Sequence, residues 1–373
     1  KSWVPMTASM RGIKAFERLV GNTRLVRLEG PSRLTGCEIL GKCEFENPGG
    51  SVKDRAGLWM LKNALAKGEL VEGEPGVIVE GTAGNTGIGL ALAGSCYGFS
   101  TVICLGSSQS KEKKDALRWA GAELLEVPPV PYADPNNYVH VAERVADKLR
   151  EQGHRVAYAN QWDNLANRQA HIDTTGPEIW EQTKGNVDAF SCAMGTGGTL
   201  TGVAEYLREK TNGKIRIALT DPPGAKLYRY YTLGRLEAEG SSITEGIGQG
   251  RLTGNMEGFN PDMAFEIHDT DALNALWDLQ ANEGLALGGS SGTNVAGAIR
   301  VARDLGPGHT IVTILCDLGA RYASKLYNSQ FLASKGLPLP PWEISEGVVA
   351  TVRKDAKAAV EAAMMQSNLR NEG

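Results

Sequence analysis

The 373-residue sequence has few of the features that mark metal-binding, disulfide-rich or membrane proteins. Its six cysteines form no C-x-x-C pair, and its five histidines do not cluster with them, which argues against a zinc site or a disulfide framework. We therefore expect buried free thiols in a reducing compartment. No apolar run approaches the roughly 20 residues of a membrane-spanning helix, and runs such as 311–316 have the length of buried strands.

An excess of charge of one sign is also lacking. The formal net charge is -4 at pH 7, and basic residues are interspersed with acidic ones. No basic stripe is present, so nucleic acid is not an expected partner. A hydrophobic content of 42% over this length is ordinary for a globular protein, and two domains are the default expectation.

Nucleotide-binding motifs and internal repeats are absent as well. The sequence contains no G-x-x-x-x-G-K-[ST], and its segment Gly195-Thr-Gly-Gly-Thr-Leu lacks the third glycine of G-x-G-x-x-G. The common phosphate-binding loops of nucleotide triphosphate and dinucleotide enzymes are therefore excluded.

The sequence does contain an alternation of strand-like and helix-like segments. Expected strands are 38–45, 77–80, 101–105, 123–127, 155–158, 187–192, 215–219 and 310–315, and expected helices are 51–67, 86–96, 138–150, 271–282 and 293–305. Strands separated by helices of this length indicate an α/β fold with parallel sheets that helices cover on both faces. The proline-rich segment 336–341 is expected to be a strap that leads into a helical tail.

Four glycine-rich turns stand at the expected junctions between strands and helices. They cover residues 47–53, 81–87, 195–199 and 288–292. In α/β folds ligands bind at such junctions, because free backbone N–H groups and the helix dipole favour anions. Each turn taken singly is as well explained as a tight connection. Four together favour one phosphorylated ligand held between them.

Lys53 is the most informative single residue. It follows Gly49-Gly50 and falls in the first turn of a helix that Ser51 would cap, with Asp54 completing a capping box. The dipole at a helix N-terminus disfavours the charged form of a lysine, and a neutral amine can attack an aldehyde to form a Schiff base. The alternative is an ordinary solvated lysine.

These motifs together resemble those of the fold-type II pyridoxal-phosphate (PLP) enzymes, which have the tryptophan synthase β-like fold. The matching segments are Asn-Pro-Gly-Gly-Ser-Val-Lys-Asp-Arg at 47–55, Gly-Asn-Thr-Gly at 84–87 and Gly-Thr-Gly-Gly-Thr at 195–199. The resemblance is strongest to cysteine synthase (O-acetylserine sulfhydrylase) and cystathionine β-synthase, and it runs from about Ile13 to Tyr322.

The resemblance implies PLP as cofactor, a homodimer, and two domains that each contain a mostly parallel twisted sheet flanked by helices. The larger, PLP-binding domain would comprise 1–58 plus 166–335. A smaller mobile domain, 59–165, would carry the loop that binds the substrate carboxylate, and 336–373 would form a C-terminal strap and tail.

The resemblance also implies roles for single residues. Lys53 matches the lysine that forms the internal aldimine, Asn85 the partner of the cofactor's ring hydroxyl, and Ser290 the partner of the pyridine nitrogen. The phosphate-binding loop is matched by Gly195, Thr196, Gly197, Gly198 and Thr199. The residues that hold the substrate carboxylate are matched by Thr82, Ala83, Gly84, Thr86 and Gln161.

The chemistry of these residue types agrees with that assignment. A phosphate dianion needs several N–H donors and no side chain in the way, which a glycine-rich turn provides. A serine does not force the pyridine nitrogen to be protonated, so the ring should be a weak electron sink suited to loss of a β-substituent. Lys53 is the natural base for the α-proton, and a thiol or sulfide would then attack an α-aminoacrylate.

Three departures from the cysteine synthase pattern leave the substrates open. Ala83 stands where the family usually has serine, Arg24 stands where proline is usual, and Thr220-Asp-Pro-Pro-Gly224 is nearer to cystathionine β-synthase. We expect a transferase or lyase that makes L-cysteine from O-acetyl-L-serine, or a similar activated serine, and sulfide. The alternative within the family is condensation of serine with homocysteine.

A reading from another class is a PLP-fold scaffold that retains the cofactor and serves as a binding protein. Ala83 keeps this reading open, whereas the intact Lys53, Asn85 and Ser290 argue against it. The sequence begins at Lys1 without methionine. We expect a cytoplasmic enzyme, or a mitochondrial one if a presequence has been removed.

Overall fold

The computed structural model describes residues 14–82, 84–344, 352, 354–356 and 358–360. Its internal contacts define two compact units, Lys1–Tyr322 and Ala323–Gly373. Both sheets of the protein lie in the first unit.

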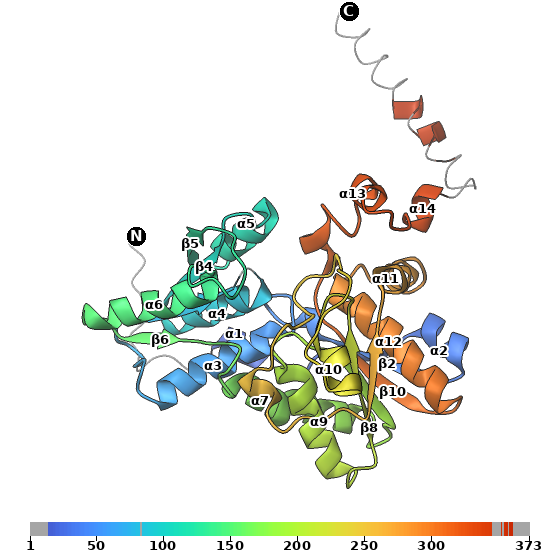
Figure 1. Cartoon of the computed structure of the whole chain (residues 1–373), viewed down its shortest axis with the longest axis horizontal. Helices are drawn as coiled ribbons and strands as arrows, with labels where there is room; N and C mark the ends of the chain where they lie inside the picture. The colour runs from blue at the N-terminus through green and yellow to red at the C-terminus, as the bar shows by residue number, and fades with distance from the viewer. Residues whose placement is uncertain (1–13, 83, 345–351, 353, 357, 361–373) are drawn as a thin grey trace, which may run out of the picture. The chain divides into compact units, whose positions relative to one another are not determined.

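One sheet has four parallel strands in the order β5-β4-β3-β6, seen on the left of Figure 1. The strands are β3 (Val77–Gly81), β4 (Ser100–Gly106), β5 (Ala122–Val127) and β6 (Val156–Tyr158). Successive side chains of a strand point to opposite faces. Ile78 therefore packs with α3 (Lys53–Ala66) and α4 (Asn85–Tyr97), whereas Val79 packs with α6 (Tyr138–Glu151). Burial on both faces explains why these strands are continuous apolar runs in the sequence.

The second sheet has six strands in the order β1-β2-β10-β7-β8-β9, and β1 alone among them pairs antiparallel to its neighbour. The strands are β1 (Leu25–Arg27), β2 (Glu38–Cys43), β7 (Ala189–Ala193), β8 (Arg216–Asp221), β9 (Met263–Glu266) and β10 (Thr310–Leu315). In β8, Leu219 packs into the core formed with α8 (Gly176–Gln182) and α9 (Gly198–Lys210). The next residue, Thr220, contacts α12 (Gly289–Leu305) at Gly297 on the opposite face.

The remaining helices surround these two layered cores. In the first unit they are α1 (Ala15–Leu19), α2 (Glu29–Thr35), α5 (Lys111–Trp119), α7 (Ala166–Ala170), α10 (Leu227–Leu233) and α11 (Asp269–Glu283), with a π-helix at His171–Thr175 and 3-10 turns at Glu44–Glu46, Gly254–Met256 and Gly319–Tyr322. The second unit contains α13 (Ser329–Ser334), α14 (Pro341–Ile344) and the described helical residues between 352 and 360. None of the helices within the described part of the chain has the length and apolar character needed to cross a membrane.

The α/β architecture with parallel sheets is confirmed. Each strand and helix predicted between residues 38 and 315 is present, the strand 310–315 with the predicted ends and the others with ends shifted by a few residues. The strand expected to reach Phe45 ends at Cys43, because the chain turns there into the 3-10 segment. The helix expected from Thr293 begins at Gly289, inside the glycine-rich turn. The division into two domains stays a prediction, and the tail beyond residue 344 lies largely outside the described residues.

Candidate active site

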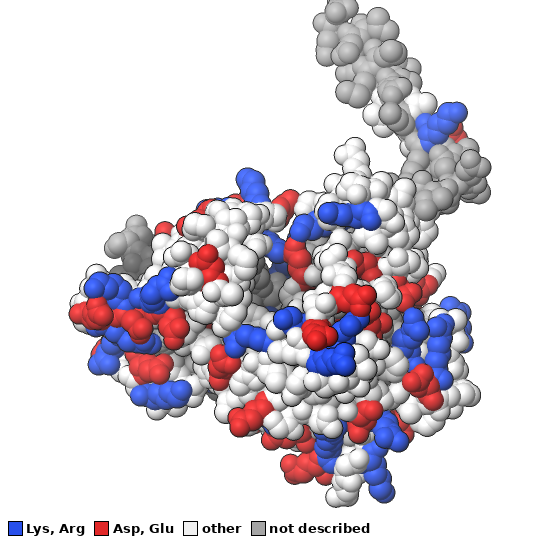
Figure 2. All heavy atoms as spheres, in the orientation of Figure 1, with Lys and Arg blue, Asp and Glu red and all other residues white. Residues whose placement is uncertain are grey.

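A cavity of about 410 Å³ lies in the first unit, where the strands of both sheets end. All four glycine-rich turns of the sequence reach it. The predicted site residues that line it are Lys53, Thr82, Gly84, Asn85, Thr86, Gln161, Gly195, Thr196, Gly197, Thr199 and Ser290. Gly198 lies behind the wall, since a Cβ there would be 2.3 Å from Asn167 Oδ1. Ala83 lies outside the described residues. On the face drawn in Figure 2, basic and acidic side chains are interspersed around the hollow.

Lys53 is the first residue of α3, and the turn before it is anchored to the end of β10. Val52 N donates to Cys316 O over 3.0 Å, and Ser51 forms a β-bridge with Asp317. Among the described residues, no carboxylate forms an ion pair with the Lys53 amine. A lysine whose turn is fixed by its backbone and whose amine forms no direct ion pair with a described carboxylate is well suited to form a covalent bond with a carbonyl ligand.

The predicted capping box at this helix is confirmed in part. Val52, the residue before the helix, makes no side-chain cap, but Ser51 Oγ accepts a hydrogen bond from Lys53 N over 3.2 Å. The Asp54 carboxylate accepts from Gly49 N over 2.5 Å and from the backbone of Ser51. Asp54 therefore also braces the glycine turn that carries Lys53.

The turn at Gly195–Thr199 forms a cradle of backbone at the start of α9. Gly197 has a φ of +92°, and a Cβ there would lie 2.6 Å from Met256 Cγ, so only glycine fits. No side chain caps the N-terminus of α9. The free N–H groups of this turn, together with the helix dipole, suit a phosphate group.

Side chains behind the cradle hold its two threonines in place. Asn167 Nδ2 donates to Thr196 Oγ1 over 2.8 Å, and His171 Nε2 lies 3.1 Å from Thr199 Oγ1. His171 belongs to the π-helix, an irregularity that often occurs at functional sites. Burial, aided by the charge of Arg55, lowers the pKa of His171 to about 3, so the imidazole is neutral.

Thr86 and Gln161 meet on the opposite wall. Thr86 Oγ1 donates to Gln161 Oε1 over 2.6 Å, and Gln161 Nε2 donates to Glu80 Oε1 over 3.0 Å. Glu80 is buried without a cation, and this burial raises its pKa to about 8. A neutral carboxyl group thus orients a glutamine that faces the cavity.

Asn85 opens α4, and both ends of its side-chain amide have partners. Asn85 Nδ2 donates to Asp317 Oδ2 over 2.7 Å, and Arg321 Nη1 donates to Asn85 Oδ1. Tyr322 OH donates to the same oxygen of Asp317 over 2.6 Å. The sequence analysis did not assign Asp317 or Tyr322 a role. Their one signal was their position at the carboxyl end of a parallel strand, where ligands bind in such folds.

An ion pair crosses the mouth of the cavity. Lys113 Nζ, on α5, pairs with the carboxylate of Glu245, which lies in the loop after α10. Both residues line the cavity together with Gln109 and Glu112. Sequence reasoning missed this pair because 132 residues separate its members and neither belongs to a motif.

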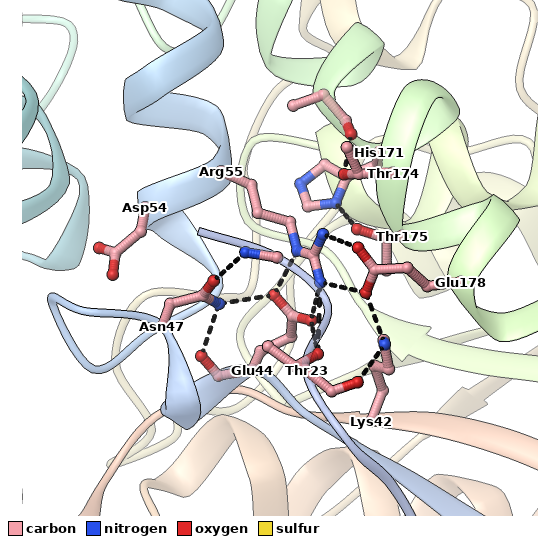
Figure 3. A network of polar contacts seen from close by, with 12 residues as sticks. Thr23, Lys42, Glu44, Asn47, Asp54, Arg55, His171, Thr174, Thr175 and Glu178 are labelled. Atoms are coloured by element: carbon pink, nitrogen blue, oxygen red, sulfur yellow. Dashed lines mark hydrogen bonds and ion pairs between the residues drawn. The ribbon is translucent and has the colours of Figure 1, made fainter. Parts of the chain in front are cut away.

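A buried network of charges lies beneath the turn that carries Lys53 (Figure 3). Arg55 forms two hydrogen bonds of 2.8 Å to Glu44, from Nε and Nη2, and two more, of 2.6 and 2.7 Å, to Glu178. Lys42 Nζ lies 2.6 Å from Glu178 Oε2. Asn47, the first residue of the turn, donates to Glu44 Oε2 over 2.9 Å. The turn therefore rests on a cluster that contains two cations and two anions.

Comparisons with known proteins identify the family of this chain. The family described as "Pyridoxal-phosphate dependent enzyme" matches residues 16–317. Cysteine synthase 1 of Neurospora crassa is 49% identical over 328 residues, which cover 87% of this chain and 86% of that protein. The solved structure of O-ureido-L-serine synthase has a TM-score of 0.75 at 31% identity, covering 86% of this chain and 96% of that one. The structure of an O-acetylserine dependent cystathionine beta-synthase from Helicobacter pylori has a TM-score of 0.73 at 29% identity, covering 85% and 99%.

Proposed function

Because this chain belongs to the family of pyridoxal-phosphate dependent enzymes, we propose that it synthesises L-cysteine from O-acetyl-L-serine, or a similar activated serine, and sulfide. The observation that carries the proposal is the convergence of Lys53, Asn85, Ser290 and the Gly195–Thr199 turn on one cavity. The identity of 49% to a cysteine synthase over most of the chain supports the choice of substrates.

The residues present fit the cofactor. When bound, PLP supplies an electron-withdrawing ring that eases loss of the α-proton and of the β-substituent. Lys53 Nζ would hold it covalently, the free N–H groups at the start of α9 would bind its phosphate, Asn85 would bind its ring hydroxyl, and Ser290 would bind its pyridine nitrogen. Lys53 Nζ, once released, would take the α-proton of the substrate.

Thr82, Gly84, Thr86 and Gln161 would hold the substrate carboxylate. The hydrogen bond of 2.6 Å from Thr86 to Gln161 and the support from Glu80 favour this role, since they fix both side chains before a ligand arrives. Ala83, which lies outside the described residues, would leave this loop with one hydroxyl group fewer than the family usually has.

Water would be excluded when the smaller domain, 59–165, closes on the larger one, 1–58 plus 166–335. The ion pair of Lys113 with Glu245 lies at the cavity mouth and joins residues of these two proposed parts. Closure of this kind protects reactive intermediates from solvent. We further propose that the protein is a homodimer. The six free cysteines support a reducing compartment, which we propose is the cytoplasm or the mitochondrion.

Covalent mapping tests the cofactor attachment. Borohydride reduction followed by peptide mass mapping should place the adduct on Lys53. Lys62 is the matched control, because it lies on the same helix with its amine paired to Glu17. An adduct on Lys62 or on the buried Lys42 would overturn the assignment.

A product assay tests the substrates. We expect cysteine from O-acetylserine and sulfide, and a loss of about 100-fold or more in Lys53→Ala. The second candidate, condensation of serine with homocysteine, is favoured by the segment Thr220–Gly224, which is nearer to the cystathionine β-synthase pattern. Faster turnover with serine and homocysteine would select it. No turnover with any β-substituted serine would favour a binding protein.

A further inference from the structure

Asp317 lies where three of the four glycine-rich turns meet. It follows β10 and is only 1% exposed. Its backbone forms a β-bridge with Ser51 in the Lys53 turn, and its carbonyl oxygen accepts from Gly288 N over 3.0 Å. Its side chain accepts from Asn85. The position of this residue thus links the segments that carry Lys53, Asn85 and Ser290.

The carboxylate of Asp317 fixes the orientation of the Asn85 amide. Asn85 gives one of its two side-chain N–H groups to Asp317 Oδ2, and its oxygen accepts from Arg321. A flip of the amide would set its NH2 group against the Arg321 guanidinium and its oxygen against a carboxylate, so the observed orientation is held from both sides. One N–H group of Asn85 then remains for a ligand in the cavity.

The space around Asp317 is built for a carboxylate. A Cβ on Gly288 would lie 2.1 Å from Asp317 Oδ1 and 2.6 Å from Tyr322 Cε2, so any larger residue at position 288 would displace both side chains. Asp317 Oδ1 is buried and has no hydrogen-bond partner among the described residues. An unsatisfied buried carboxylate oxygen carries a cost in stability, which calls for a functional explanation.

The charged and titratable groups that act on Asp317 come from three segments. Tyr322 and Arg321 lie on the following 3-10 turn, Lys53 lies on α3, and Cys316 precedes Asp317 in the chain. Burial raises the pKa of Asp317, although the hydrogen bonds from Tyr322 and Asn85 and the charges of Arg321 and Lys53 oppose this rise. Burial and the nearby Asp317 raise the pKa of Tyr322, which therefore stays a neutral donor.

We propose that Asp317 is a positioning residue that presents the Asn85 amide to the cofactor ring and places a negative charge beside the Lys53 attachment point. The proposal rests on the cofactor-binding role proposed for Asn85. Asp317 acts through Asn85 and Lys53, and no contact of its own with the cofactor is required.

The test uses the holoenzyme and measures the absorption of bound PLP against pH and the release of PLP. Asp317→Asn keeps an acceptor but removes the charge. It should lower the pH at which the absorption of the bound cofactor changes, because a nearby anion favours protonated groups. Asp317→Leu removes the acceptor too, and it should weaken PLP binding roughly tenfold. Asp54→Asn is the matched control, since Asp54 is also a buried carboxylate at the Lys53 turn but does not contact Asn85.

A double-mutant cycle separates positioning from a merely structural role. If Asp317 acts through Asn85, Asp317→Leu should weaken PLP binding in the wild-type background and have little further effect in an Asn85→Ala background. If the losses of PLP affinity caused by Asp317→Leu and by Asn85→Ala multiply in the double variant, the proposal is overturned. An absorption profile that shifts as much in Asp54→Asn as in Asp317→Asn would overturn it too. If Asn85→Ala alone leaves PLP binding and absorption unchanged, the role proposed for Asn85 fails, and the inference about Asp317 falls with it. If Asp317→Leu does not fold, the proposal is decided by the absorption profile of Asp317→Asn, compared with that of the control Asp54→Asn.

Discussion

Two glutamates of this protein are almost completely buried, one beside each sheet, and they differ in protonation. Glu44 follows β2 of the six-stranded sheet and is 0% exposed, whereas Glu80 lies in β3 of the four-stranded sheet and is 1% exposed. Burial by itself raises the pKa of both groups. For Glu44 the charge and hydrogen bonds of Arg55 outweigh burial and lower the pKa to about 2, whereas Glu80 has a pKa of about 8.

The difference shows that the partner of a buried carboxyl group, and not its depth, decides its charge. Glu44 receives four hydrogen bonds of 2.8 to 2.9 Å from Arg55, Thr23 and Asn47. Glu80 accepts only uncharged N–H groups, including two of Gln161. The first region is a permanent ion cluster that braces the Lys53 turn. The second is a neutral support for a residue at the cavity wall.

Removing Arg55, the cation that contacts both glutamates of the ion cluster, should produce the largest effect. Arg55→Leu leaves the buried Glu44 and the partly buried Glu178 without their main partner. Breaking such a network costs about 3–5 kcal/mol of folding free energy. Urea unfolding of the protein without cofactor measures this loss. Lys53→Ala, two residues earlier on the same helix, is the control and should change stability by less than about 1 kcal/mol. Equal losses in the two variants would contradict the contrast between the ion cluster and the cavity.

The free energy of unfolding should fall at acid pH in a way that depends on Glu44. Its pKa is about 2 in the folded protein against an ordinary value of 4.5, so its contribution is complete above pH 4.5 and is lost as pH falls through 2. One pKa unit corresponds to about 1.4 kcal/mol, which gives a loss of up to about 3 kcal/mol over this range. Urea unfolding at a series of acid pH values should show this loss in the wild type. Glu44→Gln should be less stable at neutral pH but show a flatter acid limb. An unchanged acid slope in Glu44→Gln would show that Glu44 is not ionised in the cluster.

The fold and the location of the cavity could be predicted from the sequence, whereas the partners of buried polar side chains could not. The α/β fold and the meeting of four glycine-rich turns at one cavity followed from local patterns, because strand ends of parallel sheets gather at one edge. The choice of Asn85 and Ser290 came from the resemblance to fold-type II PLP enzymes. The partners of Asn85 and Arg55 did not follow from local patterns, because Asp317 lies 232 residues from Asn85 and Glu178 lies 123 residues from Arg55.

The sequence did indicate that two charged side chains would be buried. Lys42 and Glu80 are single charged residues inside apolar strands, and a charge in such a place must either find a partner or become neutral. Which of the two outcomes holds depends on contacts between distant segments. Lys42 pairs with Glu178, whereas Glu80 meets an amide. The capping pattern at Ser51 is local and is present in part, since Ser51 Oγ accepts from Lys53 N, whereas the bridge from Ser51 to Asp317 joins distant segments and could not be predicted.

Glu80 should give a pH dependence of opposite sign to that of Glu44. Its folded pKa of about 8 exceeds the ordinary value of 4.5 for a glutamate, so the stability it contributes is fully present below pH 4.5 and falls as pH rises through 8. Between about pH 5 and pH 6 the difference in unfolding free energy between Glu80→Gln and wild type should move in favour of the variant by up to about 1.4 kcal/mol. Comparison with the variant isolates Glu80 from Asp54 and Asp221, whose pKa values burial also raises to about 7. A constant difference across this range would mean that Glu80 is ionised.

The smallest effect is expected at an arginine–glutamate pair that lies close to the ion cluster but in solvent. Arg24 Nε donates to Glu46 Oε1 over 2.5 Å, the same chemistry as Arg55 with Glu44, yet the Arg24 side chain is 78% exposed. Water already solvates the Arg24 guanidinium, 20% of the Glu46 side chain is exposed, and salt screens their attraction. Arg24→Ala should therefore leave the urea midpoint unchanged within error at physiological salt, in contrast to the large loss in Arg55→Leu. A destabilisation comparable to that of Arg55→Leu would show that burial does not separate the two pairs. A small loss that appears only at low salt would instead agree with a screened surface interaction, and it would leave the difference between the two regions intact.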